Sequence, residues 1–139
     1  MGPAELAGEM LNRQARKAAE ALQLPCHVLG SDERRMRDEL FAEFWFRMGD
    51  TRPASPDSGF VSRTVGLLQF TVYAPLGTDV SEIMPFVGHL KRSFDQQTWT
   101  YRDGMLKTGL TDAKQIPPRF RYGRLIWVVD ASFDLLRGD

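Results

Sequence analysis

The stretch GLLQFTVYAPLGTD, residues 66–79, decides the fold of this chain. Its first ten residues alternate between two sets of side chains and are rich in β-branched and aromatic types, which is typical of a β-strand. One face of this strand would hold the apolar residues Leu68, Phe70, Val72 and Ala74. Pro75 and Gly77 are expected to end the strand, because proline and glycine interrupt a regular ladder.

A helix is predicted directly after this strand. Asp79, followed by Glu82, resembles a capping box with aspartate as the cap. Apolar residues then recur at helical spacing, and the stripe consists of Val80, Ile83, Met84, Val87, Leu90 and Phe94. Pro85 removes one hydrogen bond inside such a helix, so the helix is expected either to kink there or to begin near it.

Two further elements are predicted before the central strand. Residues 4–23 show the spacing of an amphipathic helix, ended before Pro25. Residues 26–29 are expected to form a short strand or a loop. Residues 41–48 alternate as in a strand, and its core face would hold Ala42, Phe44, Phe46 and Met48.

Three more strands are predicted after the second helix. Residues 98–101 and 105–110 flank an Asp-Gly pair, which is a strong signal for a hairpin. Residues 125–133 form the last predicted strand, which is apolar on both faces at its start. Such a strand lies in the middle of a sheet or is covered by a partner subunit.

The order of these elements predicts an α+β fold. The helices are too few for a doubly wound sheet, and the short links favour antiparallel pairing. We therefore expect a mixed, mostly antiparallel sheet of four to five strands packed against two helices, in a single domain over residues 4–134. Residues 31–40 carry many charges and are expected to form a solvated turn or short helix.

A long flexible loop is predicted within this domain, at residues 49–64. Gly49, Pro53, Pro56 and Gly59 lie in this segment, and glycine and proline at that density interrupt both helices and ladders. Compact domains seldom keep such a long loop without a use for it. The loop is therefore expected to be functional, or disordered in isolation.

The composition favours a soluble protein of the reducing cytosol. Eighteen basic residues balance eighteen acidic ones, so no overall field attracts nucleic acid or an anionic membrane. Cys26 is the only cysteine and cannot form an internal disulfide. The first thirty residues lack the apolar run of a signal peptide, and no window is apolar enough to span a bilayer.

The sequence offers little for catalysis or metal binding. Two histidines, His27 and His89, and one cysteine are too few for a zinc site. Cys26 and His27 would face opposite ways in a strand, so a packed thiol beside an ordinary histidine is expected. His89 lies off the helical stripe, which predicts a surface histidine. The strand-to-helix turn holds only Gly77, so no phosphate-binding loop is present. We expect no enzyme activity, no cofactor and no metal.

A basic and aromatic motif, RFRYGR, precedes the last strand. Its arginines, together with Arg52 and Arg63 of the predicted loop, are the candidate contacts for a partner or for phosphate groups: Arg119, Arg121, Arg124, Arg52 and Arg63. Basic and aromatic side chains together can bind nucleic acid. The alternative is a strand entry whose aromatics pack inward while the arginines stay in water. The zero net charge favours this alternative.

Two stretches of the chain resemble a family of phage proteins. GLLQFTVYAPLGTD is similar to that family's Gly-x-Leu-Gln strand, its Pro-x-Gly turn and the helix that follows, and RYGRLIWVVDASF is similar to its last strand. The family is that of the tail terminator proteins of long-tailed phages, of the minor tail protein U type. The charged residues 31–40 and the segment 49–64 depart from its pattern.

This resemblance implies a structural role. Members are small α+β subunits that form a ring at the head-proximal end of the tail tube. Six subunits are expected in the ring, and self-association is expected to be weak in the free protein. The implied partners are further copies of the chain, the tail tube protein and a head-completion protein. The implied locations are the bacterial cytoplasm during assembly and then the virion tail. The resemblance implies no catalytic residue and no cofactor. We also expect no small-molecule substrate and no membrane contact, and nucleic acid is not an expected partner.

Overall fold

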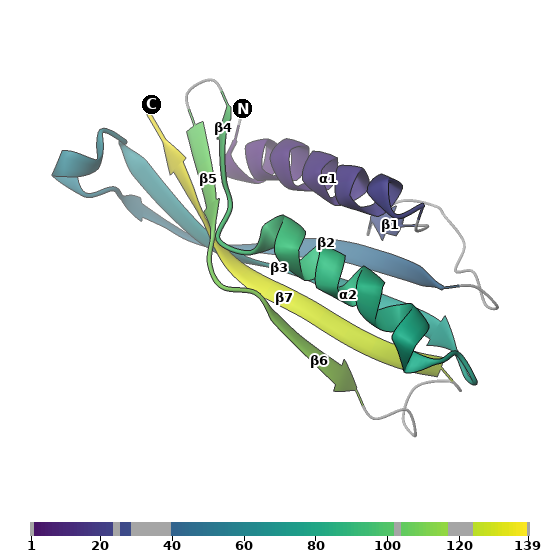
Figure 1. Cartoon of the computed structure of the whole chain (residues 1–139). Helices are drawn as coiled ribbons and strands as arrows, with labels where there is room; N and C mark the ends of the chain where they lie inside the picture. Colours follow the sequence, from purple (N-terminus) through teal and green to yellow (C-terminus); the bar gives the residue numbers. More distant parts are fainter. Residues whose placement is uncertain (1, 24–25, 29–39, 102–103, 117–123, 139) are drawn as a thin grey trace.

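Two helices lie on one face of a twisted sheet in the computed structural model (Figure 1). The structure describes residues 2–23, 26–28, 40–101, 104–116 and 124–138. In these residues the sheet has seven strands, most of them antiparallel. The predicted α+β class with a mostly antiparallel sheet is thus confirmed, whereas the predicted number of four to five strands is too low.

The elements follow one another in an order that interleaves helices and strands. They are α1 (Pro3–Ala21), β1 (Cys26–Val28), β2 (Phe41–Pro53), the 3-10 turn η1 (Pro56–Ser58), β3 (Ser62–Pro75), α2 (Val80–Phe94), β4 (Thr98–Tyr101), β5 (Gly104–Thr108), β6 (Asp112–Ile116) and β7 (Arg124–Arg137). The strand order across the sheet is β1-β2-β3-β7-β5-β4, and β6 also pairs with β7.

Strands β3 and β7 form the middle of the sheet, antiparallel to each other over their whole length. The other edge of β7 is shared by two strands, because β5 pairs with its second half and β6 with its first half. The prediction that the last strand lies in the middle of a sheet is therefore confirmed. Strand β1 pairs with β2 in parallel, which makes the sheet mixed.

The core lies between the helices and the face of the sheet that they cover. The predicted inward residues of β3, from Leu68 to Ala74 in alternation, are fully buried. Ala42 and Phe44 of β2 are also fully buried, and Phe46 and Met48 pack against the core from its margin. The rings of Phe44, Phe70 and Phe94 contact one another in the centre of this core. We call this side of the sheet the helix face.

Helix α2 begins where the sequence places its cap. The side chain of Asp79 accepts a hydrogen bond of 3.0 Å from the backbone N–H of Ser81. The helix then continues through Pro85 to Phe94, so a start near Pro85 is excluded. Val80 and Met84 are exposed and do not belong to the buried stripe.

Residues 49–64 do not form the long loop that the sequence predicts. Strand β2 continues to Pro53 and β3 begins at Ser62, so the segment is a hairpin that extends beyond both helices (Figure 1). We call it the arm. Its glycines and prolines occupy positions that a hairpin tolerates: Gly49 lies at a break in register between Met48 and Thr51, as in a bulge, and Gly59 follows η1 with a φ of 81°.

Strand β6 was not predicted, because its sequence DAKQI is polar and half exposed. The chain passes from β5 to β6 along the same edge of β7, and Thr111 anchors this passage to the end of α2. The carboxylate of Asp95 accepts hydrogen bonds from the backbone N–H of Thr111, at 2.8 Å, and from its hydroxyl, at 3.1 Å. The residue at the end of α2 thus fixes the passage into β6, and β6 itself is held by its pairing with β7.

The prediction of a surface histidine at position 89 is wrong. His89 is half buried, and its Nε2 atom is buried without a hydrogen-bond partner among the described residues. The side chains of Cys26 and His27 and the charged residues 31–39 lie outside the described part of the chain, and so do the predictions made for them.

The Asp95 carboxylate gives the fold a dependence on pH. The hydrogen bonds from the Thr111 backbone and hydroxyl lower its pKa below the ordinary value of 3.8. A lowered folded-state pKa stabilises the fold above the unfolded-state value, and this contribution is lost as the pH falls through the folded-state value. We expect Asp95→Asn to be less stable than the parent in thermal unfolding at pH 7. The difference should shrink towards pH 2, and a difference independent of pH would contradict this account.

Candidate interaction surface

The face of the sheet opposite the helices carries the polar and the exposed apolar residues of β3. Side chains alternate between the two faces of a strand, so Arg63, Val65 and Leu67 lie on this side while Thr64 and Leu68 point to the helix face. Val65 is 40% exposed and Leu67 is 43% exposed. We call this side the open face, although Phe41, Ile126 and Val128 are buried at its other end. Its arm end presents apolar side chains to solvent.

Arg52 and Arg63, two of the predicted contact residues, lie opposite each other on the arm. Both are exposed, and with Asp50, Pro53 and Val65 they line a hollow of about 320 Å³. The structure therefore brings these two arginines together at the end of the sheet that is farthest from α2.

Arg63 is partly neutralised by an ion pair. Its guanidinium donates hydrogen bonds to one carboxylate oxygen of Asp134 on β7, from Nε at 3.2 Å and from the terminal nitrogen at 3.0 Å. Both side chains are substantially exposed, and an exposed pair of this kind contributes only about 0–1 kcal/mol. The pair orients Arg63 on the open face without burying it.

The predicted arginines do not form one continuous basic surface in the described part of the chain. Arg124 opens β7 opposite Pro75, whereas Arg63 lies opposite Leu136 near the other end of β7. At about 3.3 Å per residue the two positions are roughly 40 Å apart along the strand. Arg119 and Arg121 lie outside the described residues.

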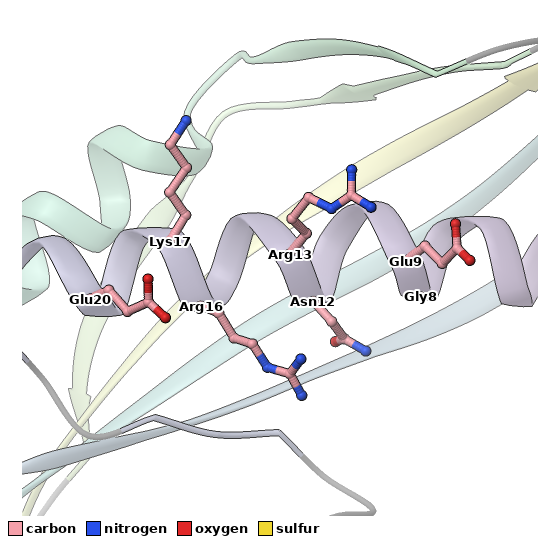
Figure 2. Close-up of a pocket in the computed structure, with 7 residues that line it drawn as sticks. All are labelled: Gly8, Glu9, Asn12, Arg13, Arg16, Lys17 and Glu20. Carbon is pink, nitrogen blue, oxygen red and sulfur yellow. The ribbon is translucent and has the colours of Figure 1, made fainter.

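A second hollow, of about 560 Å³, lies along the polar side of α1. Figure 2 shows Arg13 and Lys17 pointing to one side of the helix, and Asn12 and Arg16 pointing to the other. Acidic and basic residues alternate at helical spacing here, as in a solvated helix face. Since the charged groups diverge and largely compensate one another, this hollow lacks the convergence of a binding site.

The described residues offer no arrangement typical of metal binding or membrane insertion. No group of three or more His, Cys, Asp or Glu side chains comes together within them. Neither α1 nor α2 is both long and apolar enough to cross a bilayer.

Sequence reasoning missed Val65 and Leu67 as surface residues. The sequence did carry a signal for these residues, because the start of the central strand has apolar residues on both faces, as the last strand does. The alternation of side chains does not by itself show whether the second face is covered by other parts of the protein. The structure leaves this part of the open face uncovered among the described residues.

Comparisons with known proteins show the fold alone. No family model matches the chain, and no curated protein matches it. One solved structure is similar over nearly the whole length, covering 97% of this chain and 96% of its own, with a TM-score of 0.70 and 12% sequence identity. The overall fold thus has a counterpart in another protein, at a sequence identity too low to carry function.

Proposed function

We propose that this chain is a virion assembly protein of the phage tail terminator type, a subunit that associates with its own copies into a ring at the head-proximal end of a tail tube. The proposal starts from the resemblance of GLLQFTVYAPLGTD and RYGRLIWVVDASF to that family. In this role the tail tube protein and a head-completion protein are the partners, and the chain acts through its surfaces alone.

The observation that supports this role best is the exposure of apolar side chains on the arm and on the part of β3 that follows it. The arm extends past both helices, and Val61, Val65 and Leu67 are 59%, 40% and 43% exposed. Val65 and Leu67 are neighbours on one face of β3, because side chains two residues apart share a face, and adjoining exposed apolar side chains mark interaction sites. A projecting hairpin gains little stability from its own core, so its length favours a contact with another chain.

Charges placed on this surface should prevent assembly. We expect the double variant Val65→Lys, Leu67→Lys to remain folded but to lose binding to the tail tube protein, because burying two ammonium groups in a contact is unfavourable. Analytical ultracentrifugation over a concentration series measures the change, with and without the tail tube protein.

The double variant Val80→Lys, Met84→Lys is the matched control, because these residues of α2 are 49% and 42% exposed but lie on the other side of the sheet. It should assemble like the parent. Equal loss of assembly in both variants would show that the added lysines have the same effect on either side of the sheet. A parent that stays monomeric with and without the tube protein would overturn the proposed role.

Binding of nucleic acid through RFRYGR is the alternative role, and it makes an opposite prediction. We expect no retention of DNA or RNA in a gel shift at low salt, because the described arginines do not form a continuous basic surface. Retention that falls steeply with salt would indicate phosphate contacts. If such retention were lost in the Arg119→Ala, Arg121→Ala, Arg124→Ala variant, the alternative would replace the proposed function.

A further inference from the structure

The half of the sheet that carries the arm ends in two strand edges, one on each side. On one side, β1 pairs with β2 only at residues 42–44, so the rest of β2 has no strand beside it among the described residues. On the other side, β4 pairs with no described strand except β5. An edge strand presents backbone groups that can pair with another chain. This half-sheet can therefore be extended at both sides.

The outer edge of β4 has backbone groups ready to pair. Gln97 receives the backbone hydrogen bond of Thr108, and in an antiparallel pair the bonded positions alternate. Trp99 thus bonds to β5, while the N–H and C=O groups of Thr98 and Thr100 point away from the sheet. Both threonines are exposed.

The two edges also match in the chemistry of their faces. On the helix face, β4 presents Trp99, which packs edge to face on Phe94, and β2 presents Phe46 and Met48, which are only partly buried. On the open face, β4 presents threonines, and β2 presents the exposed Arg47 and the half-buried Trp45. A strand added in this way continues the apolar row of the helix face.

A groove accompanies the edge of β4. It has a volume of about 310 Å³ and lies between β4 and α1, with Met10, Arg13 and Gln14 on the helix and residues 98–101 on the strand. Side chains that project from an added strand towards the helix face would enter it. The partly buried Phe46 and Met48 of a second copy have the required apolar character.

Strand directions fix how the two edges would meet. Four antiparallel pairings separate β2 from β4 across the sheet, so the two strands run the same way. A neighbouring copy related by rotation about an axis along the strands would place its β2 parallel to β4. Because the two surfaces differ, the contact repeats from copy to copy until a ring closes.

We propose that the subunits join edge to edge, with residues 45–48 of β2 in one copy pairing in parallel with residues 98–100 of β4 in the next. The sheet would then run without interruption around the ring. This inference rests on the proposed function, because it assigns the surface through which the ring forms.

A proline at the outward position of β4 tests the pairing. Thr100→Pro removes an N–H that points away from β5, a position that edge strands tolerate. We expect its self-association in analytical ultracentrifugation to be at least tenfold weaker than that of the parent, at an unchanged monomer melting temperature. Thr100→Ala keeps the N–H and should assemble like the parent. Assembly of Thr100→Pro at the parental strength would overturn the pairing.

Disulfide trapping provides a second test that does not depend on the folding of the proline variant. The test uses two chains in a Cys26→Ser background, one with Thr100→Cys and Arg47→Cys and the other with Thr100→Cys and Trp45→Cys. These two pairs cover the registers in which the paired positions share the open face. We expect a ladder of linked subunits under mild oxidation. The single-cysteine chains should give none, since the contact joins unlike surfaces.

The outcomes separate this inference from the proposed function. Rings without a ladder in either register would overturn the edge pairing and leave the ring in place. Dimers in the single-cysteine chains would show a contact between like surfaces and would likewise overturn it. A parent that never associates would overturn both.

Discussion

Replacing Phe70 by alanine is expected to lower the free energy of unfolding by about 3–5 kcal/mol. Phe70 is fully buried on β3, and its ring centroid lies 4.7 Å from that of Phe44 and 5.2 Å from that of Phe94. Truncation removes both contacts and leaves a cavity between the sheet and α2, which the surrounding backbone cannot fill. Urea unfolding, followed by circular dichroism, measures the loss against a total stability of about 5–15 kcal/mol.

Leu67→Ala is the matched control for this substitution. Leu67 lies on the same strand but on the open face, where it is 43% exposed. Its truncation should cost less than about 1 kcal/mol, because little apolar surface is lost from the core. Similar losses for both variants would contradict the assignment of the two faces of β3.

Replacing Gly66 by alanine is expected to lower stability by about 1–3 kcal/mol through overpacking. A methyl group at this position would lie 2.6 Å from the backbone oxygen of Arg47, 2.7 Å from one ring carbon of Phe133 and closer still to a second ring carbon. Phe133 is the residue opposite Gly66 on β7, so its ring fills the space that a side chain would need. Thermal and urea unfolding measure the loss.

Gly8→Ala is the same chemical change in a place that has room for it. The added methyl group would lie 3.5 Å from the ring of Phe46, an ordinary contact, and alanine favours a helix over glycine by about 1 kcal/mol. Stability should therefore rise.

In a Phe133→Leu background the cost of Gly66→Ala should fall. An undiminished cost there would mean that the clash with the Arg47 backbone decides the effect.

Strongly patterned segments could be predicted from the sequence. The alternation over residues 66–75 gave the correct core face because one face of that strand is apolar throughout. Asp79 and the helical stripe likewise located α2. In each segment the apolar residues recur at the regular spacing of a strand or of a helix, and this spacing identifies the buried side.

The arm and β6 could not be predicted, because their stability comes from the tertiary structure. Gly49 and Pro53 weaken a local strand pattern, yet β3 and β7 hold the arm together through pairing. DAKQI has little apolar content, and its strand exists because β7 offers it an edge. For the candidate surface, the sequence indicated Arg52 and Arg63 but gave no sign that they face each other, nor that the edges of β2 and β4 are open.

The place of β7 in the middle of the sheet has a consequence for biosynthesis. Strands β3, β5 and β6 all pair with it, yet the ribosome makes it after all of them. Until residue 137 has left the exit tunnel, β6 has no partner strand, and β3 and β5 each keep one edge open beside their partners β2 and β4. The contacts between β3 and β7 join residues far apart in the chain and form slowly, and open strand edges are prone to aggregate meanwhile. We therefore expect nascent chains that stall before β7 to be clients of holding chaperones.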